Sequence, residues 1–177
     1  MIYGTILSHI SDMKTYRRRL IREKVLQTLY AYEISREPIA FIEEQQLTEL
    51  KPHPHDFEFA KDLIEKIIQH LDEIDSIIKS NVPNWEFDRI ALIDKIIMRM
   101  GIAEFYHFPD IPPKVTINEA IEIAKSFSTE KSGKFINGVL DTILERLRTT
   151  KKLYKTGRGL LDTSITNSHP DPAEEAK

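Results

Sequence analysis

The chain has 177 residues, a formal net charge of −3 and no cysteine. It is long enough for one ordinary domain or two very small ones. The absence of cysteine excludes disulfides, thiolate metal sites and cysteine nucleophiles, and it favours a reducing, cytoplasmic compartment. The first twelve residues lack the basic start of a signal peptide, and no stretch has the length of a membrane span.

Positive charge is concentrated near the amino terminus. Residues 14–24, KTYRRRLIREK, contain six basic residues and one acidic residue, so this segment carries +5 and the rest of the chain −8. This asymmetry indicates an anionic partner bound at one place, because the acidic remainder repels a polyanion. The alternative is a solvated basic helix end without a partner.

Helical periodicity dominates the sequence, and no convincing alternating strand occurs. A first helix is predicted over about 15–35, followed by a short one that begins at Pro38. The stretch KPHPHD then forms a loop. Apolar residues at steps of three and four predict one continuous helix over 57–79.

The second half of the chain contains three further predicted helices. Residues 87–108 leave little polar face and are expected to form a central, buried helix. Thr116 and Glu119 have the spacing of a capping box, which predicts a helix that opens there and ends at Phe127. The last helix is expected over 131–148 and includes Gly138, which allows a close helix contact.

Both ends are expected to lie outside the helical domain, which covers 14–150. Residues 151–177 are rich in Gly, Ser, Thr, Pro and charged residues, and this composition predicts a disordered tail. Met13 is a natural first residue. Residues 1–13 are therefore expected to be an unstructured extension, or the product of a start codon assigned too far upstream.

Common catalytic and cofactor motifs do not occur: the sequence has no glycine-rich phosphate loop, HExxH helix or GxSxG elbow. His53, His55 and Asp56 form the one candidate metal cluster. No second group of ligands is spaced to complete the shell, so we interpret them as loop residues and expect no metal and no cofactor. The sequence predicts a binding protein and not an enzyme.

A helical wheel divides the first helix into an apolar face and a basic strip. The face predicted to contact the core holds Ile21, Val25, Leu29 and Tyr32. The strip predicted to be exposed holds Arg18, Arg19, Arg22 and Tyr30. Guanidinium groups bind phosphates and an aromatic ring stacks on an unpaired base, so this strip suits single-stranded RNA. A plain solvated helix and an anionic membrane surface remain as alternatives.

Four segments carry a family resemblance: RRLIREKVLQTLYAYE, IDKIIMRMGIAEF, KVTINEAIEIAKSFS and KFINGVLDTILERL. In order and spacing they resemble the NusB family of bacterial transcription antitermination proteins. The resemblance covers about Thr15 to Leu147, and INEAIEIAKSF and FINGVLD are its most specific parts. It implies an all-α fold of six to seven helices in two small helical subdomains, with the arginine-rich helix at the edge.

The resemblance also implies a function. It implies a transcription antitermination factor that binds the boxA element of nascent RNA together with NusE, a small-subunit ribosomal protein that also serves in transcription. The heterodimer loads onto RNA polymerase, and the assembly promotes readthrough of ribosomal RNA transcription. Monomers and homodimers are both compatible with the resemblance.

Position by position, the resemblance implies RNA-binding residues on three helices. Those on the first helix are Arg18, Arg19, Arg22, Gln27 and Tyr30; those near the other end are Lys125, Ser132, Phe135 and Asn137. Lys131 departs from the family pattern and is added as a candidate for its positive charge. For Phe135 a place in the core, and for Asn137 a capping role, are equally compatible. Many relatives carry an acidic residue where this chain has Lys131, so we expect higher RNA affinity, steeper salt dependence and looser sequence discrimination.

The NusE side is expected around residues 85–99. Asp88 and Asp94 match acidic positions that in the family face basic residues of the ribosomal protein, and Ile90 is expected as an exposed apolar neighbour, with burial as its alternative. Trp85 is interpreted as a core anchor. Two other functions stay open: an accessory RNA-binding module for a ribosomal RNA methyltransferase, and a helical protein-binding adaptor.

Overall fold

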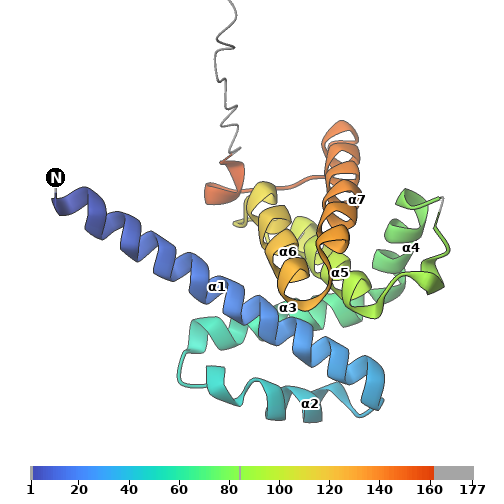
Figure 1. The fold of residues 1–177 in the computed structure, drawn as a ribbon, viewed down its shortest axis with the longest axis horizontal. Coiled ribbons are helices and arrows are strands. Elements are labelled where there is room, and N and C mark those ends of the chain that lie inside the picture. The colour runs from blue at the N-terminus through green and yellow to red at the C-terminus, as the bar shows by residue number, and fades with distance from the viewer. Residues whose placement is uncertain (1, 84, 162–177) are drawn as a thin grey trace, which may run out of the picture.

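The computed structural model describes residues 2–83 and 85–161, with side chains from residue 17 onward. These residues form helices and no strand, which confirms the all-α class (Figure 1). The α-helices are α1 (Ile2–Ser35), α2 (Ile39–Gln46), α3 (Pro54–Gln69), α4 (Leu71–Asn81), α5 (Leu92–His107), α6 (Pro113–Phe127) and α7 (Glu130–Thr149). The short 3-10 helices are η1 (Thr48–Leu50), η2 (Phe87–Arg89) and η3 (Gly157–Leu160).

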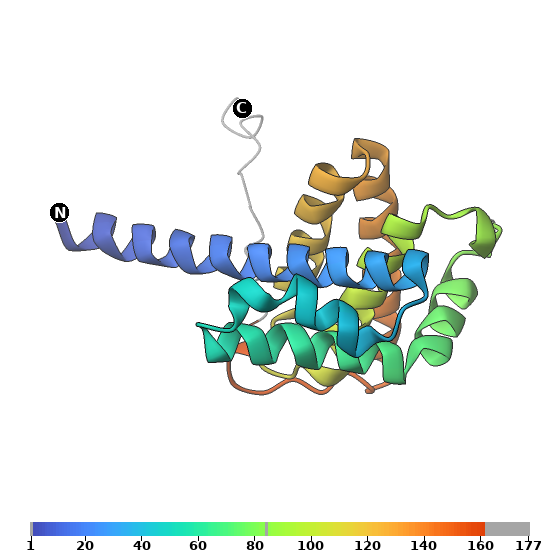
Figure 2. The ribbon, with the colours of Figure 1, turned by 90° about the horizontal axis from the view of Figure 1, so that it is seen from below.

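The helices form two groups around α5. Helices α1, α2 and α3 pack together, α4, α6 and α7 pack on α5, and α5 also contacts α1 and α3. Figure 2 shows α2 and α3 on one side of α1 and α6 on the other. Every residue from Ile96 to Phe105 is buried, so the prediction of a central helix is confirmed. One apolar core joins both groups.

A glycine of α5 allows its close contact with α7. A Cβ at Gly101 would lie 2.9 Å from Cδ1 of Leu140, so a larger residue would displace that side chain. The expected close contact at Gly138 is wrong, since nothing lies within 4 Å of the corresponding position there. Gly138 is nevertheless inside α7, as predicted.

Two predicted helix boundaries are wrong. The single helix expected over 57–79 is divided at His70, whose backbone angles (φ −114°, ψ 21°) leave the helical region. The apolar spacing continues through this break, and no Gly or Pro marks it. Helix α6 begins at Pro113, so Thr116 and Glu119 lie inside it and form no capping box; their side chains instead bind groups on α5 and α1.

The ends of the chain also differ from expectation. Helix α1 begins at Ile2 instead of near Thr15, and its first turns extend beyond the other helices (Figures 1 and 2). The expected disordered tail is partly ordered, because residues 152–161 pack against the end of α5. The remaining residues, 162–177, lie outside the described part of the chain.

Lys155 anchors this carboxyl-terminal segment. Its side chain is buried, and Nζ donates hydrogen bonds to the backbone oxygens of Glu104 (3.0 Å) and Phe108 (2.8 Å). The N–H of Thr156 donates to the oxygen of Pro109 at 2.9 Å. The two carbonyls that bind Nζ each also accept a backbone N–H, from Phe108 and Ile111 respectively, and the helix dipole at this end favours a cation. A single amine thus orders a segment whose composition predicts disorder.

Folding stability is expected to depend on the protonation of Lys155. Burial lowers the pKa of this amine to about 8, although Glu104 and Asp110 oppose the shift. The unfolded chain therefore holds more protons between this pKa and the ordinary value of 10.5, so stability rises with pH across that range. Between about pH 7.5 and 9.5, the free energy of unfolding of the wild type should rise by about 1 to 2 kcal/mol relative to that of Lys155→Met, as measured by urea unfolding. Identical pH profiles of the two proteins would contradict this expectation.

Candidate nucleic-acid interface

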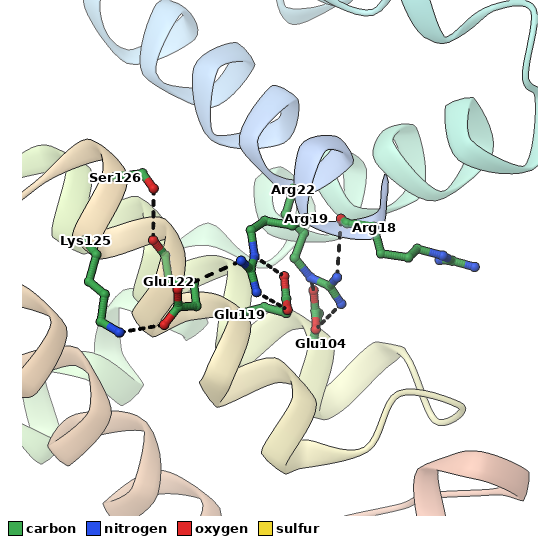
Figure 3. A network of polar contacts seen from close by, with 8 residues as sticks. All are labelled: Arg18, Arg19, Arg22, Glu104, Glu119, Glu122, Lys125 and Ser126. Atoms are coloured by element: carbon green, nitrogen blue, oxygen red, sulfur yellow. Dashed lines mark hydrogen bonds and ion pairs between the residues drawn. The ribbon is translucent and has the colours of Figure 1, made fainter. Parts of the chain in front are cut away.

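The arginines of α1 lie in three different environments. Arg22 is buried, Arg19 is half-buried and Arg18 is exposed. Figure 3 shows Arg19 and Arg22 pointing toward carboxylates of α6 and α5, whereas Arg18 points away from both. The prediction that all three share an exposed strip is therefore wrong for Arg22.

Glu104 of α5 holds Arg22 inside the protein. The guanidinium donates from Nε to Oε1 (2.6 Å) and from Nη2 to Oε2 (3.1 Å), and the hydroxyl of Thr116 donates to the same Oε2 at 2.7 Å. Burial by itself lowers the pKa of a guanidinium, but the attraction of Glu104 outweighs it and raises the pKa of Arg22. Arg22 therefore stays charged inside the protein and depends on its carboxylate partner.

Glu119 orients Arg19 at the surface between α1 and α6. Nε and Nη2 of Arg19 each donate to this carboxylate at 3.0 Å, and these hydrogen bonds raise the pKa of Arg19. Nη1 lies 3.9 Å from Glu122, which also accepts from Nζ of Lys125 at 2.6 Å (Figure 3). The candidates on α1 and α6 are thus brought together. Of the five N–H donors of a guanidinium, Glu119 uses two.

Arg18 borders a cleft of about 740 Å³, which we call the arginine cleft. Its walls come from α1, residues 52–56, residues 110–115 and the carboxyl-terminal segment. The guanidinium carbon of Arg18 lies 4.9 Å from the ring centre of Phe59, a cation–π distance. Nε of Arg17, which also borders the cleft, donates to Asp56 at 2.5 Å. Arg18 therefore presents a cation to the cleft without a carboxylate partner in the described structure.

The other candidates of α1 lie further along the helix. Gln27 is exposed, and the side chain of Tyr30 is 41% exposed. The core face of the wheel is confirmed at Ile21, Val25 and Leu29. Tyr32, expected on the same face, is half-buried. Local periodicity thus placed the apolar residues of this helix correctly, although it misplaced Arg22.

The candidates of α7 divide into exposed and packed residues. Lys131 is exposed, whereas Ser132 is buried at the helix start, where its N–H donates to Oγ1 of Thr129 at 3.0 Å and its hydroxyl contacts that of Ser128. Phe135 is half-buried, and its ring centre lies 5.2 Å from that of Trp85. Asn137 is half-buried in the next turn. Ser132 therefore has a structural role as part of the helix cap.

Most residues of the expected partner-binding surface have the opposite exposure from the one predicted. Asp88 is exposed as predicted, but Ile90 and Asp94 are buried, with 6% and 7% of their surfaces exposed. Trp85, interpreted as a core anchor, is 61% exposed. Ile90 ends η2 and joins the core, whereas Asp94 occupies the first turn of α5, where the helix dipole favours a carboxylate. Within the described residues, Oδ1 of Asp94 accepts no hydrogen bond.

The described residues contain no group of three or more His, Asp and Glu side chains arranged to hold a metal ion. His53 and His55 are exposed and border the arginine cleft. As to membranes, none of the helices described is both long and apolar enough to span one.

Sequence reasoning missed the carboxylates that pair with Arg22 and Arg19, and these carboxylates determine how far each arginine is buried. Glu104 lies within the largely apolar run IIMRMGIAEF, whose other charged residue is Arg99, and an acidic residue at such a position signals a buried cation as its partner. The sequence does not say which cation that is, because Arg22 is 82 positions away. Arg158, which borders the arginine cleft, was missed because it lies in the segment predicted to be disordered.

Comparisons with known proteins agree with this fold. The model of the NusB family matches residues 19–145. A transcription antitermination protein NusB from Chloroherpeton thalassium is 45% identical over 150 residues, which are 82% of this chain and 69% of that protein. T. maritima NusB matches with a TM-score of 0.68 and 38% identity over 72% of this chain and 90% of its own. A crystal structure of the antitermination factors NusB and NusE in complex with dsRNA matches with a TM-score of 0.67 and 26% identity over 74% and 98%. Sequence and fold together show that the chain belongs to the NusB family.

Proposed function

We propose that this protein is a transcription antitermination factor that binds boxA-type single-stranded RNA together with NusE and promotes readthrough of ribosomal RNA transcription. Family membership supports the antitermination role. A structural neighbour that contains NusB, NusE and dsRNA supports NusE and RNA as the two partners.

The observation that carries the RNA proposal is the link between α1 and α6 through Glu122. It brings Arg19 and Lys125, from segments about a hundred residues apart, to one surface beside the arginine cleft. Lys131 at the exposed start of α7 adds a further cation. We call Arg19, Lys125 and Lys131, together with Arg18 at the adjoining cleft, the cationic face. An RNA strand that neutralises such a face releases counterions, so its binding weakens as salt rises.

The candidates take different roles in this proposal. Arg18, Lys125 and Lys131 bind phosphates, and Arg19 does so with the N–H donors that Glu119 leaves free. Tyr30 and the edge of the Phe135–Trp85 pair offer rings for base stacking. Arg22 and Ser132 support the surface from inside and do not contact RNA. Gln27 and Asn137 remain candidate hydrogen-bonding groups.

The NusE side of the proposal rests on Asp88, which is exposed on η2. Asp94 and Ile90 act from within: they hold η2 and the start of α5, and neither offers an exposed contact. An exposed acidic residue suits a basic ribosomal protein, and such rim charges mainly set the association rate.

Fluorescence anisotropy with a labelled boxA-like single strand tests the function. The full-length protein should bind this strand more tightly with NusE present than without it, and more tightly than it binds a strand of the same composition in scrambled order. Binding that NusE does not strengthen at moderate salt would overturn the proposal. Co-purification with a ribosomal RNA methyltransferase in place of NusE would assign the protein to the accessory-module class.

A further inference from the structure

Residues 152–161 form a strap that lies outside the matched family region, which ends at residue 145. Besides the Lys155 and Thr156 hydrogen bonds, the strap depends on Gly159, which is buried against the 108–112 turn. A Cβ at Gly159 would lie 1.9 Å from the backbone oxygen of Pro109, well inside van der Waals contact. The position therefore accepts only glycine while the strap is docked.

The docked strap brings Arg158 to the arginine cleft. Arg158 is exposed, lies between the anchors Lys155 and Gly159, and borders the cleft together with Arg17 and Arg18. Among the described residues its guanidinium has no ion pair, whereas Arg17 is paired with Asp56. Anchors on both sides hold its backbone in place, so less conformational entropy is lost when a ligand binds.

The charges around the cleft favour an anionic ligand. Three carboxylates border it, and two of them are already bound to arginines: Asp56 to Arg17 and Glu119 to Arg19. Asp110 is the third. Arg18 and Arg158 are the cations left for a ligand. The cleft volume of about 740 Å³ lies within the range of small-ligand sites and suits a nucleotide unit. The cleft also adjoins Glu119, which binds Arg19 of the cationic face.

We propose that the carboxyl-terminal strap positions Arg158 as an additional phosphate-binding residue, which extends the RNA site across the arginine cleft. This inference rests on the proposed RNA-binding function. Arg158 lines the cleft from the carboxyl-terminal segment and Arg18 lines it from α1, so one nucleotide unit binds between them. The contact is to phosphate, so it raises affinity for any sequence alike.

Replacing Arg158 with glutamine tests the contact. In the anisotropy titration with NusE, Arg158→Gln should weaken binding about two- to fivefold at moderate salt, the effect of one exposed ion pair. The slope of log affinity against log salt should fall by about 0.7, the value for one phosphate on a single strand. Arg36→Gln is the matched control: it removes the same charge from the residue that follows α1, whose last residue lies roughly 27 Å from Arg17 along the helix.

A second substitution tests the strap. Gly159→Ala leaves Arg158 in the chain but prevents docking of the strap, so it should reproduce the loss of RNA affinity seen for Arg158→Gln. In the double variant, Arg158→Gln should then cause no further loss. The inference is wrong, while the proposed function stands, if Arg158→Gln binds RNA as tightly as Arg36→Gln does. The same holds if the losses of RNA affinity from Arg158→Gln and Gly159→Ala add in the double variant. If the wild type fails to bind RNA with NusE, the function itself fails. Circular dichroism melting shows whether each variant is folded.

Discussion

Arg22→Gln is expected to lower the free energy of unfolding by about 3 to 5 kcal/mol, the usual cost of removing one partner of a buried ion pair. The reason is Glu104, whose side chain is 2% exposed and which would lose two of its charged hydrogen bonds. Urea unfolding followed by circular dichroism measures this change. Because family resemblance assigns Arg22 to the RNA site, the outcome distinguishes a structural arginine from a binding one.

Arg18→Gln is the matched control for this prediction. Arg18 lies one turn from Arg22, is exposed and contacts the Phe59 ring instead of a carboxylate. Its replacement should change the free energy of unfolding by less than about 1 kcal/mol, the range of an exposed cation–π contact. Equal destabilisation by the two substitutions would contradict the different environments of these arginines.

The double variant Arg22→Met with Glu104→Leu is expected to be more stable than either single variant. Apolar side chains of similar volume replace a buried ion pair at little cost, whereas each single variant leaves a charge without its partner. The hydroxyl of Thr116 loses its acceptor in the double variant, so recovery should be incomplete. If the losses in free energy of unfolding from the two single variants simply add in the double variant, the two residues are not coupled.

The combined variant Arg18→Gln, Lys125→Gln and Lys131→Gln is expected to weaken binding of boxA-like RNA by about 100-fold. Three exposed phosphate contacts at about 1 kcal/mol each account for this figure. The salt slope should fall by about 2, since each phosphate on a single strand contributes about 0.7. All three side chains are exposed, so the unfolding midpoint should stay close to that of the wild type.

Arg36→Gln, Lys61→Gln and Lys66→Gln together form the control for this effect. They remove the same net charge from the end of α1 and from α3, away from the cationic face. A comparable loss of RNA affinity in this control would show that overall charge, and not the cationic face, attracts the RNA.

Much of the fold was predictable because helices have a local signature. The apolar steps identified the core face of α1, and the almost continuous apolar run identified α5 as the central helix. The break at His70 was not predictable, since the same apolar period continues on both sides. Both helices pack on α5, but α3 also packs on α1 and α4 on α7. The start of α6 was misplaced because Thr116 has the spacing of a cap but uses its hydroxyl for Glu104.

The sequence predicted which helices carry the candidate residues better than it predicted which of those residues are exposed. Charge density pointed to α1, and the family motifs pointed to α6 and α7. Burial then divided the candidates: Arg18, Lys125 and Lys131 are exposed, while Arg22, Ser132, Ile90 and Asp94 are not. A helical wheel shows which direction a side chain takes, but not whether a carboxylate from another helix meets it there.

The sequence by itself determined the all-helical class, the central helix, the family and the concentration of positive charge on α1. These depend on periodicity, composition and motif order, which are readable along the chain. Only the tertiary structure decided which arginines are free. A guanidinium is buried where a distant carboxylate compensates its desolvation, as Glu104 does for Arg22. The ordering of the strap by Lys155 depends in the same way on carbonyls about fifty residues away.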